Sequence, residues 1–368
     1  MTITKPDKTP LIGIALDSGG TRGGAHIGVL DVFNEHNIPI DLIVGSSAGA
    51  FIGALYAAGK IDTIKDIIKD MSWRESLSFY LDPVFPISGL LAGRRARAFI
   101  KDIVGDITIE ELPIRFVAVA TDLLTGETVA IDRGPLVDAV MASISMPGIF
   151  KPVIYMDRLL TDGGVSDPLP LDVLKSYAPR ITIACNLHSG LSEGLSPFRK
   201  KAIIKMQKSS NQEEDIASWI ISHVIDVVRS QRMLDDIKPA VKNFAGKIGS
   251  TYTGRPLKMK GSDLVALLQN QLNLSKDKVA RLVENSFAKK GKRVSLNIFE
   301  IMASSTNIQQ YQKNRLMLCN EKPDVLISPD VMYIRSLEFR KIPEAIKEGR
   351  DKAIGAIPEI KALLEPKS

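Results

Sequence analysis

The feature that most constrains the fold is an arrangement that occurs twice, in which a short apolar run passes into a glycine-rich turn and then into a helical pattern. The first apolar run, residues 11–16, is followed by Ser-Gly-Gly at 18–20, and the second, residues 42–44, leads into Gly-Ser-Ser-Ala-Gly at 45–49. Such runs are typical of strands buried on both faces. Strands that alternate with helices predict an α/β fold whose sheet is covered on both sides.

The alternation continues along the first half of the chain. Buried strands are expected at residues 116–120, 129–131 and 181–185, and helices at residues 63–71, 95–104 and 137–144. After residue 188 a linker rich in Gly, Ser and Pro is followed by about a hundred residues with amphipathic helical patterns and no convincing strand.

From about residue 294 the earlier pattern returns, with a helix to about residue 319, a strand at 324–328 and helices from 342 to 364. We therefore predict one discontinuous α/β domain formed by residues 10–188 and 294–366. Residues 189–293 are predicted to be a helical insertion.

The predicted insertion also differs from the rest of the chain in charge. Residues 196–298 contain 20 Lys and Arg against 9 Asp and Glu, although the whole chain carries a net charge of only +6. This asymmetry indicates either a solvated basic surface or an anionic partner, such as an anionic membrane surface. Nucleic acid is disfavoured, because the aromatic residues of the segment are too scattered to stack bases.

Composition indicates the cell compartment in which the protein is expected. No apolar run approaches the roughly 20 residues of a transmembrane helix, and the first ten residues lack the apolar core of a secretory signal. Two cysteines, Cys185 and Cys319, are too few for a disulfide framework and, with four histidines, do not suggest a zinc site. We expect a cytoplasmic protein, with peripheral membrane binding and oligomerisation left open.

Ser47 lies at the centre of a Gly45-x-Ser47-x-Gly49 pattern between a predicted strand and a predicted helix. Glycines two positions before and after the serine let the strand and the helix approach without Cβ clashes. The helix N-terminus favours developing negative charge. This is the setting that an exposed nucleophile requires, and a tight packing turn is the alternative.

The turn at residues 18–23 offers successive backbone N–H groups that can bind an anion, which in acyl transfer is an oxyanion hole. A dinucleotide site is the alternative, because Gly20 and Gly23 fit part of G-x-G-x-x-G with Ser18 in place of the first glycine. That site requires an acidic residue at the far end of the second strand, and Asp41 lies before this strand. The dinucleotide site is therefore the weaker prediction.

A serine nucleophile needs a base, and Asp162, followed by Gly163 and Gly164, is a candidate. Alone, this triplet is typical of an ordinary turn. No histidine has a distinctive setting, although His188 and His223 follow the aspartate in the chain order of a Ser-Asp-His triad.

Together these motifs resemble the patatin-like phospholipase family. The similarity includes the stretch ASISMPGIF at residues 142–150, and it covers residues 10–188 and, more loosely, 294–366. It implies a three-layer α/β/α fold around a mostly parallel sheet. It also implies a lipid acyl hydrolase that cleaves ester bonds of phospholipids or lysophospholipids, with a lipid substrate and no metal or organic cofactor.

The resemblance implies a role for each motif residue. Ser47 is expected as the nucleophile and Asp162 as its base, in a dyad without histidine that forms an acyl-serine. Arg22 is expected to hold the glycine loop or an anionic lipid head group. The oxyanion donors would be the amides of Gly19, Gly20 and Thr21, and the motif glycines would be Gly45, Gly49, Gly163 and Gly164.

The base and one loop position need comment. Because an aspartate with a pKa of about 3.9 is a weak base for serine, we expect burial to raise the pKa of Asp162. Ser18 departs from the family, which usually has glycine there, and we expect this to be tolerated because the donors are backbone groups. A binding or regulatory module with little turnover is the alternative function, and a nucleotide-dependent α/β enzyme is a weaker one.

Overall fold

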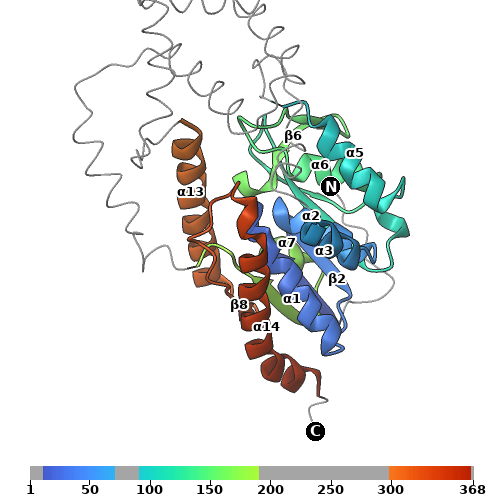
Figure 1. Cartoon of the computed structure of the whole chain (residues 1–368), viewed down its shortest axis with the longest axis vertical. Helices are drawn as coiled ribbons and strands as arrows, with labels where there is room; N and C mark the ends of the chain where they lie inside the picture. Colours follow the sequence, from blue (N-terminus) through green and yellow to red (C-terminus); the bar gives the residue numbers. More distant parts are fainter. Residues whose placement is uncertain (1–10, 71–90, 190–297, 366–368) are drawn as a thin grey trace, which may run out of the picture. The chain divides into compact units, whose positions relative to one another are not determined.

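The structure, a computed structural model, describes residues 11–70, 91–189 and 298–365 (Figure 1). They form an eight-stranded sheet in the order β5-β6-β3-β2-β1-β7-β8, with β4 also paired to β3. All pairings among β3, β2, β1, β7 and β8 are parallel, and those of β4, β5 and β6 are antiparallel. The strands are β1 (Ile12–Leu16), β2 (Leu42–Ser46), β3 (Arg115–Asp122), β4 (Thr128–Ile131), β5 (Val153–Tyr155), β6 (Arg158–Asp162), β7 (Ile181–Cys185) and β8 (Val325–Ile327).

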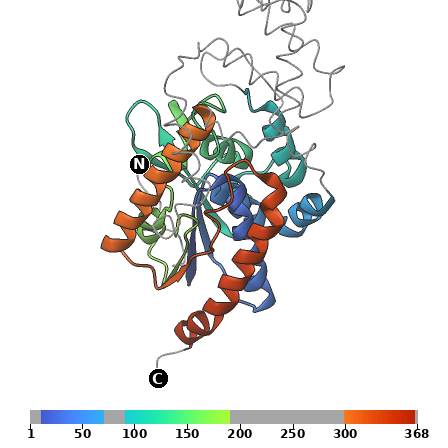
Figure 2. The ribbon, with the colours of Figure 1, turned by 60° about the vertical axis from the view of Figure 1, so that its left-hand side comes forward.

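Helices cover both faces of this sheet, as Figure 2 shows for the two long C-terminal helices. One face of β1, with Ile12, Ile14 and Leu16, contributes to a large core formed with α1, α2, α3, α5, α6 and α14. The other face, with Ala15, contributes to a smaller core formed with α7 and the end of α13. The α/β/α fold with a mostly parallel sheet is therefore confirmed. The helices are α1 (Gly24–Glu35), α2 (Ala48–Ala57), α3 (Ile61–Asp70), α5 (Arg94–Val104), α6 (Leu136–Ser143), α7 (Leu171–Ser176), α13 (Ile298–Asn320) and α14 (Ile342–Leu364).

The C-terminal helix α14 packs on the first helix, α1, at very short range. A Cβ at Gly28 of α1 would strike the backbone of α14, and a Cβ at Gly349 of α14 would strike the backbone of α1. Arg350 adds ion pairs to Asp31 and to Glu35. Residues 298–365 therefore complete the same layers as the described part of residues 11–189.

The predicted basic insertion, residues 189–293, lies outside the described residues except for Ser189. Of the helices that the structure does describe, none is both long and apolar enough to cross a membrane.

Candidate active site

Ser47 occupies the sharp turn between β2 and α2. The strand ends at Ser46 and the helix begins at Ala48, so that Ser47 is the N-cap residue, with φ 52° and ψ −116°. A positive φ at a residue other than glycine costs on the order of 1–3 kcal/mol and persists only where the surroundings impose it. This strained strand-to-helix turn is the geometry that presents a nucleophilic serine at the C-terminal end of a central strand.

Two glycines make that turn sterically possible. A Cβ at Gly45 would overlap the backbone of Gly49 and Ala50, and a Cβ at Gly49 would overlap the carbonyl group of Leu16 in the neighbouring strand. The Gly-x-Ser-x-Gly pattern therefore reflects close backbone packing on both sides of Ser47.

The structure brings Asp162 directly to Ser47. Strand β6 pairs with β3 so that Asp162 lies opposite Ala120, and Ser47 Oγ donates a 2.6 Å hydrogen bond to Asp162 Oδ2. The other carboxylate oxygen, Oδ1, accepts the N–H of Gly164 at 2.7 Å. A Cβ at Gly163 would strike the carbonyl oxygen of Val119, so the loop after Asp162 can pass β3 only with glycine there.

Burial changes the pKa of the Asp162 carboxyl group. It raises the pKa of Asp162 to about 6, while the hydrogen bonds from Ser47 and from the Gly164 N–H act to lower it. This direction is the one expected from sequence. A carboxylate with such a pKa is still ionised at neutral pH and is a better proton acceptor than an ordinary aspartate.

The glycine loop lies between β1 and α1, where a short 3-10 turn, η1 (Gly20–Gly23), follows Gly19. Gly20 lines the same cavity as Ser47. Among the described residues, no acceptor faces the amides of Gly19 and Gly20. The Thr21 amide, in contrast, donates to the Ser336 carbonyl oxygen at 2.9 Å. Of the three donors expected from sequence, two therefore have no hydrogen-bond partner among the described residues, and the third is engaged.

Arg22 supports this loop from inside the protein. Its side chain is 1% exposed, and its Nε donates to the carbonyl oxygen of Gly19 at 3.2 Å while Nη2 donates to Asn307 Oδ1 at 2.6 Å. Burial lowers the pKa of Arg22 to about 10, and the nearby Asp17 acts to raise it. Of the two roles expected for Arg22, loop support fits this geometry, and head-group binding does not because the guanidinium is inaccessible.

His188 also contacts the residues that hold the glycine loop. Its Nδ1 lies 2.8 Å from Asp17 Oδ2 and its Nε2 lies 3.3 Å from Arg22 Nη2. Because arginine can only donate, we assign the proton of His188 to Nδ1, directed at Asp17. Within the described part of the chain, Asp162 is the one titratable group hydrogen-bonded to Ser47; His223 lies outside that part.

Two serines of the stretch at residues 142–150 hold the Ser47–Asp162 pair in place. The family resemblance pointed to this stretch but not to the role of its serines. Ser143 Oγ accepts the N–H of Ser47 at 2.9 Å and donates to the carbonyl oxygen of Val119 at 2.6 Å. The carbonyl oxygen of Ser145 accepts the N–H of Asp162 at 3.0 Å. One short segment thus contacts both members of the pair.

Asp41, the acid considered for a dinucleotide site, lies far from the glycine loop. Its carboxylate accepts the backbone N–H groups of Leu11 and Ile12, at the opposite end of β1. It therefore cannot bind a ribose at the loop, and this geometry argues against the nucleotide-dependent alternative.

An apolar cavity opens beside Ser47. It contains about 1180 Å³ of space, including part that is open to solvent, and its walls come from α1, α2, α3, α5 and the segment before α14. Hydrocarbon side chains make up most of the lining, as is usual for sites that bind apolar ligands. The largest of them are Phe51, Phe99, Phe150 and Phe339.

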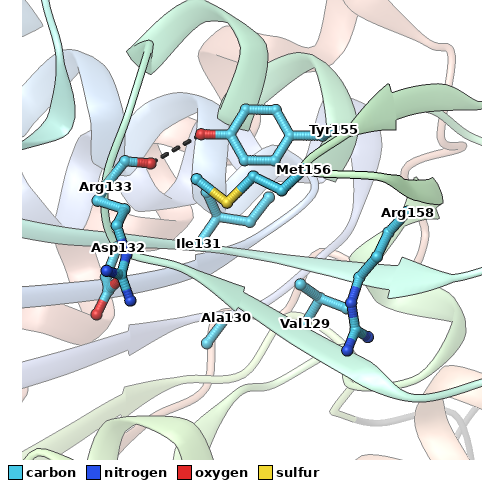
Figure 3. Close-up of a pocket in the computed structure, with 8 residues that line it drawn as sticks. All are labelled: Val129, Ala130, Ile131, Asp132, Arg133, Tyr155, Met156 and Arg158. Carbon is cyan, nitrogen blue, oxygen red and sulfur yellow. Dashed lines mark hydrogen bonds and ion pairs between the residues drawn. The ribbon is translucent and has the colours of Figure 1, made fainter. Parts of the chain in front are cut away.

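A second, smaller hollow of about 270 Å³ lies between β4 and the β5–β6 hairpin (Figure 3). There the Tyr155 hydroxyl donates to the carbonyl oxygen of Arg133 at 2.8 Å, and Arg158 is paired with Asp122 and Glu127. Neither Ser47 nor Asp162 lines it, so of these two cavities the apolar one is the one that Ser47 lines.

Comparison with known proteins agrees with this geometry. Residues 14–175 match the family model described as patatin-like phospholipase. The chain is 32% identical to an uncharacterized NTE family protein of Mycobacterium tuberculosis over 353 residues, which are 95% of this chain and 92% of that protein. The chain belongs to the patatin-like phospholipase family.

This patatin-like chain is also similar to eukaryotic proteins over about half its length. It is 34% identical to the neuropathy target esterase sws of Drosophila melanogaster over 183 residues. These residues are 48% of this chain and 13% of that protein. A patatin-like phospholipase domain-containing protein of Caenorhabditis elegans is 35% identical over 184 residues, 48% of this chain and 14% of that protein. Membership of the family indicates a lipid acyl hydrolase.

Proposed function

We propose that this patatin-like protein is a serine acyl hydrolase that cleaves ester bonds of phospholipids or lysophospholipids through a Ser47–Asp162 dyad. The observation that carries the proposal is the 2.6 Å hydrogen bond from Ser47 Oγ to Asp162 Oδ2, formed where the apolar cavity meets the glycine loop.

In the first half-reaction, Ser47 Oγ attacks the ester carbonyl carbon and its proton passes to Asp162 Oδ2. The negative charge that develops on the carbonyl oxygen is stabilised by the N–H groups of Gly19 and Gly20. That neither group is hydrogen-bonded to a described residue supports this proposed role. When the tetrahedral intermediate collapses, the C–O bond to the alcohol breaks, and the alcohol leaves with the proton from Asp162. The fatty acyl group remains bonded to Ser47.

In the second half-reaction, water attacks the acyl-serine and gives its proton to Asp162. Collapse of the second tetrahedral intermediate breaks the bond to Ser47 Oγ, which takes the proton back, and releases the fatty acid. Asp162 is suited to both steps because the Gly164 N–H holds Oδ1 and leaves Oδ2 directed at Ser47.

The apolar cavity is suited to the acyl chain. Its walls bring Phe51 and Phe99 to the same space as Ser47, and burying a hydrocarbon chain there stabilises the complex by about 0.8 kcal/mol for each methylene group. The basic segment at residues 196–298 is proposed to bind an anionic membrane surface, a proposal that rests on its charge.

The direct test is fatty-acid release from vesicles of anionic phospholipid and of lysophospholipid. The wild type is expected to release fatty acid, and Ser47→Ala is expected to release none above background. Equal release by both proteins would show that Ser47 is not the nucleophile. No release by a folded wild type would favour the alternative of a binding or regulatory module.

A further inference from the structure

Among residues 302–320 of helix α13, the two buried side chains are polar, although Met317 and Leu318 near the end of the helix also pack on the smaller core. Gln310 and Asn314 are 6% and 2% exposed, whereas Met302, Ile308 and Leu316 are 41%, 44% and 63% exposed. A helix on a domain surface ordinarily buries its apolar stripe. Burying amides costs free energy unless they are hydrogen-bonded, so the partners of these side chains should explain why they are there.

One set of partners leads to the glycine loop. Asn307 Oδ1 accepts a 2.6 Å hydrogen bond from Arg22 Nη2, and Arg22 Nε donates to the carbonyl oxygen of Gly19 at 3.2 Å. Asn314 Nδ2 donates to Asp17 Oδ2 at 2.9 Å, just before the loop begins. Helix α13 thus holds the glycine loop through hydrogen bonds that are buried or partly buried.

A second set of partners leads to the loop that follows Asp162. Gln310 Nε2 donates to the carbonyl oxygen of Gly164 at 3.2 Å, and Lys313 Nζ donates to that of Ser166 at 2.6 Å. The N–H of the same Gly164 holds Asp162 Oδ1. Because a Cβ at Gly164 would strike the Gln310 amide, the two groups are in close contact.

We infer that Asn307 and Gln310 are positioning residues for the reaction, and that α13 uses them to set the oxyanion donors and the base relative to each other. The inference rests on the function proposed for Ser47 and Asp162. Asn307 acts through Arg22 on Gly19, and Gln310 acts through Gly164. Because the two amides are three residues apart on one helix face, one rigid element holds both loops.

Three variants test this inference against a matched control. Asn307→Leu removes the acceptor for Arg22 at similar volume, and Asn307→Asp restores it. Gln310→Met removes the donor to Gly164 at similar volume. Gln309→Met makes the same change at the neighbouring position, which is exposed, and serves as the control. Ser47→Ala defines the background rate.

With a short-chain ester as substrate, Asn307→Leu is expected to lower kcat by about 10- to 100-fold with little change in KM, since small displacements of catalytic groups have effects of this size. Asn307→Asp should recover most of the loss. Gln310→Met should move the acid limb of the pH profile to higher pH, because the Gly164 N–H that lowers the pKa of Asp162 is no longer held in place. Gln309→Met should change neither quantity.

Hydrogen–deuterium exchange gives a readout that does not need turnover. Asn307→Leu should raise exchange in peptides that cover residues 17–24, Gln310→Met should raise it in those that cover 162–167, and Gln309→Met should raise neither. Unchanged exchange and unchanged kcat in both variants, or a uniform rise across the sheet, would overturn the inference. If the wild type shows no hydrolysis that depends on Ser47, the proposed function fails, while the exchange pattern still decides the role of α13.

Discussion

The two turns that form the site follow neighbouring parallel strands, but they are held in different ways. The serine turn after β2 is held mainly by its own glycines and by Ser143. The glycine loop after β1 is held from outside, by Ser336 through Thr21 and by Asn307 through Arg22, contacts that span 315 and 285 residues of sequence. The serine turn therefore depends on the first half of the chain, whereas the glycine loop depends also on its last quarter.

The largest effect should come from Asp162, the expected general base for Ser47. Asp162→Asn keeps the size of the side chain but cannot take a proton, so kcat for ester hydrolysis should fall by about 10²- to 10⁴-fold, the usual contribution of a general base. Ester hydrolysis assays at pH 8 with purified, folded variant would measure this. A variant with wild-type kcat would remove Asp162 from the mechanism.

Ser143→Ala tests how the serine turn is held. The buried N–H of Ser47 loses its acceptor, which should lower the free energy of unfolding by about 1–3 kcal/mol, with a fall in kcat as the turn relaxes. Urea unfolding monitored by circular dichroism would measure the first effect. Ser176→Ala removes another serine hydroxyl, an exposed one bonded to a carbonyl oxygen, and should change the stability little; equal losses in both variants would contradict the account.

The pH profile should report the ionisation of Asp162, the hydrogen-bond partner of Ser47. Because burial raises the pKa of Asp162 to about 6, the carboxyl group is protonated below this pH and can no longer accept the proton of Ser47. The value of kcat/KM should therefore fall about tenfold per pH unit below roughly pH 6 and be level just above it. Steady-state rates between pH 4 and pH 8 would show this; a rate that is level down to pH 4 would exclude Asp162 as the base.

The smallest effect should come from the Ser336 contact, one of the two outer supports of the glycine loop. Thr21→Val removes the 2.9 Å hydrogen bond from Oγ1 to the Ser336 carbonyl oxygen but keeps the one from the Thr21 amide. We expect a loss of unfolding free energy of about 1 kcal/mol and a change in kcat of only a few fold. A larger loss of kcat than in Ser143→Ala would reverse the ranking of the two turns.

The local parts of this site could be predicted from the sequence. Continuous apolar runs mark β1 and β2, and the glycines around Ser47 mark the turn between β2 and α2, because these features act over a few residues. The β5–β6 hairpin was harder to predict. Its turn places Met156 and Asp157 at positive φ, without the glycine or asparagine that usually marks such a turn.

The supports that come from distant parts of the chain could not be predicted. Asn307, Gln310 and Asn314 look like the polar, solvent-facing side of a surface helix. Only the fold shows that Gln310 and Asn314 are buried and that the partly buried Asn307 is hydrogen-bonded to Arg22. The contact of Ser336 with Thr21 likewise joins segments that share no local pattern. The same distant contact engages the Thr21 amide. The family resemblance had placed this amide among the oxyanion donors, and the sequence alone could not show that it has another partner.

The measurement that tests the central claim most directly is covalent labelling of the nucleophile with a lipid-like fluorophosphonate, followed by mass spectrometry of the digested protein. A single adduct on the peptide that contains Ser47, formed by the wild type and strongly slowed in Asp162→Asn, is the predicted result. An adduct on a different residue, or labelling of Ser47 at the same rate in both proteins, would contradict the Ser47–Asp162 dyad.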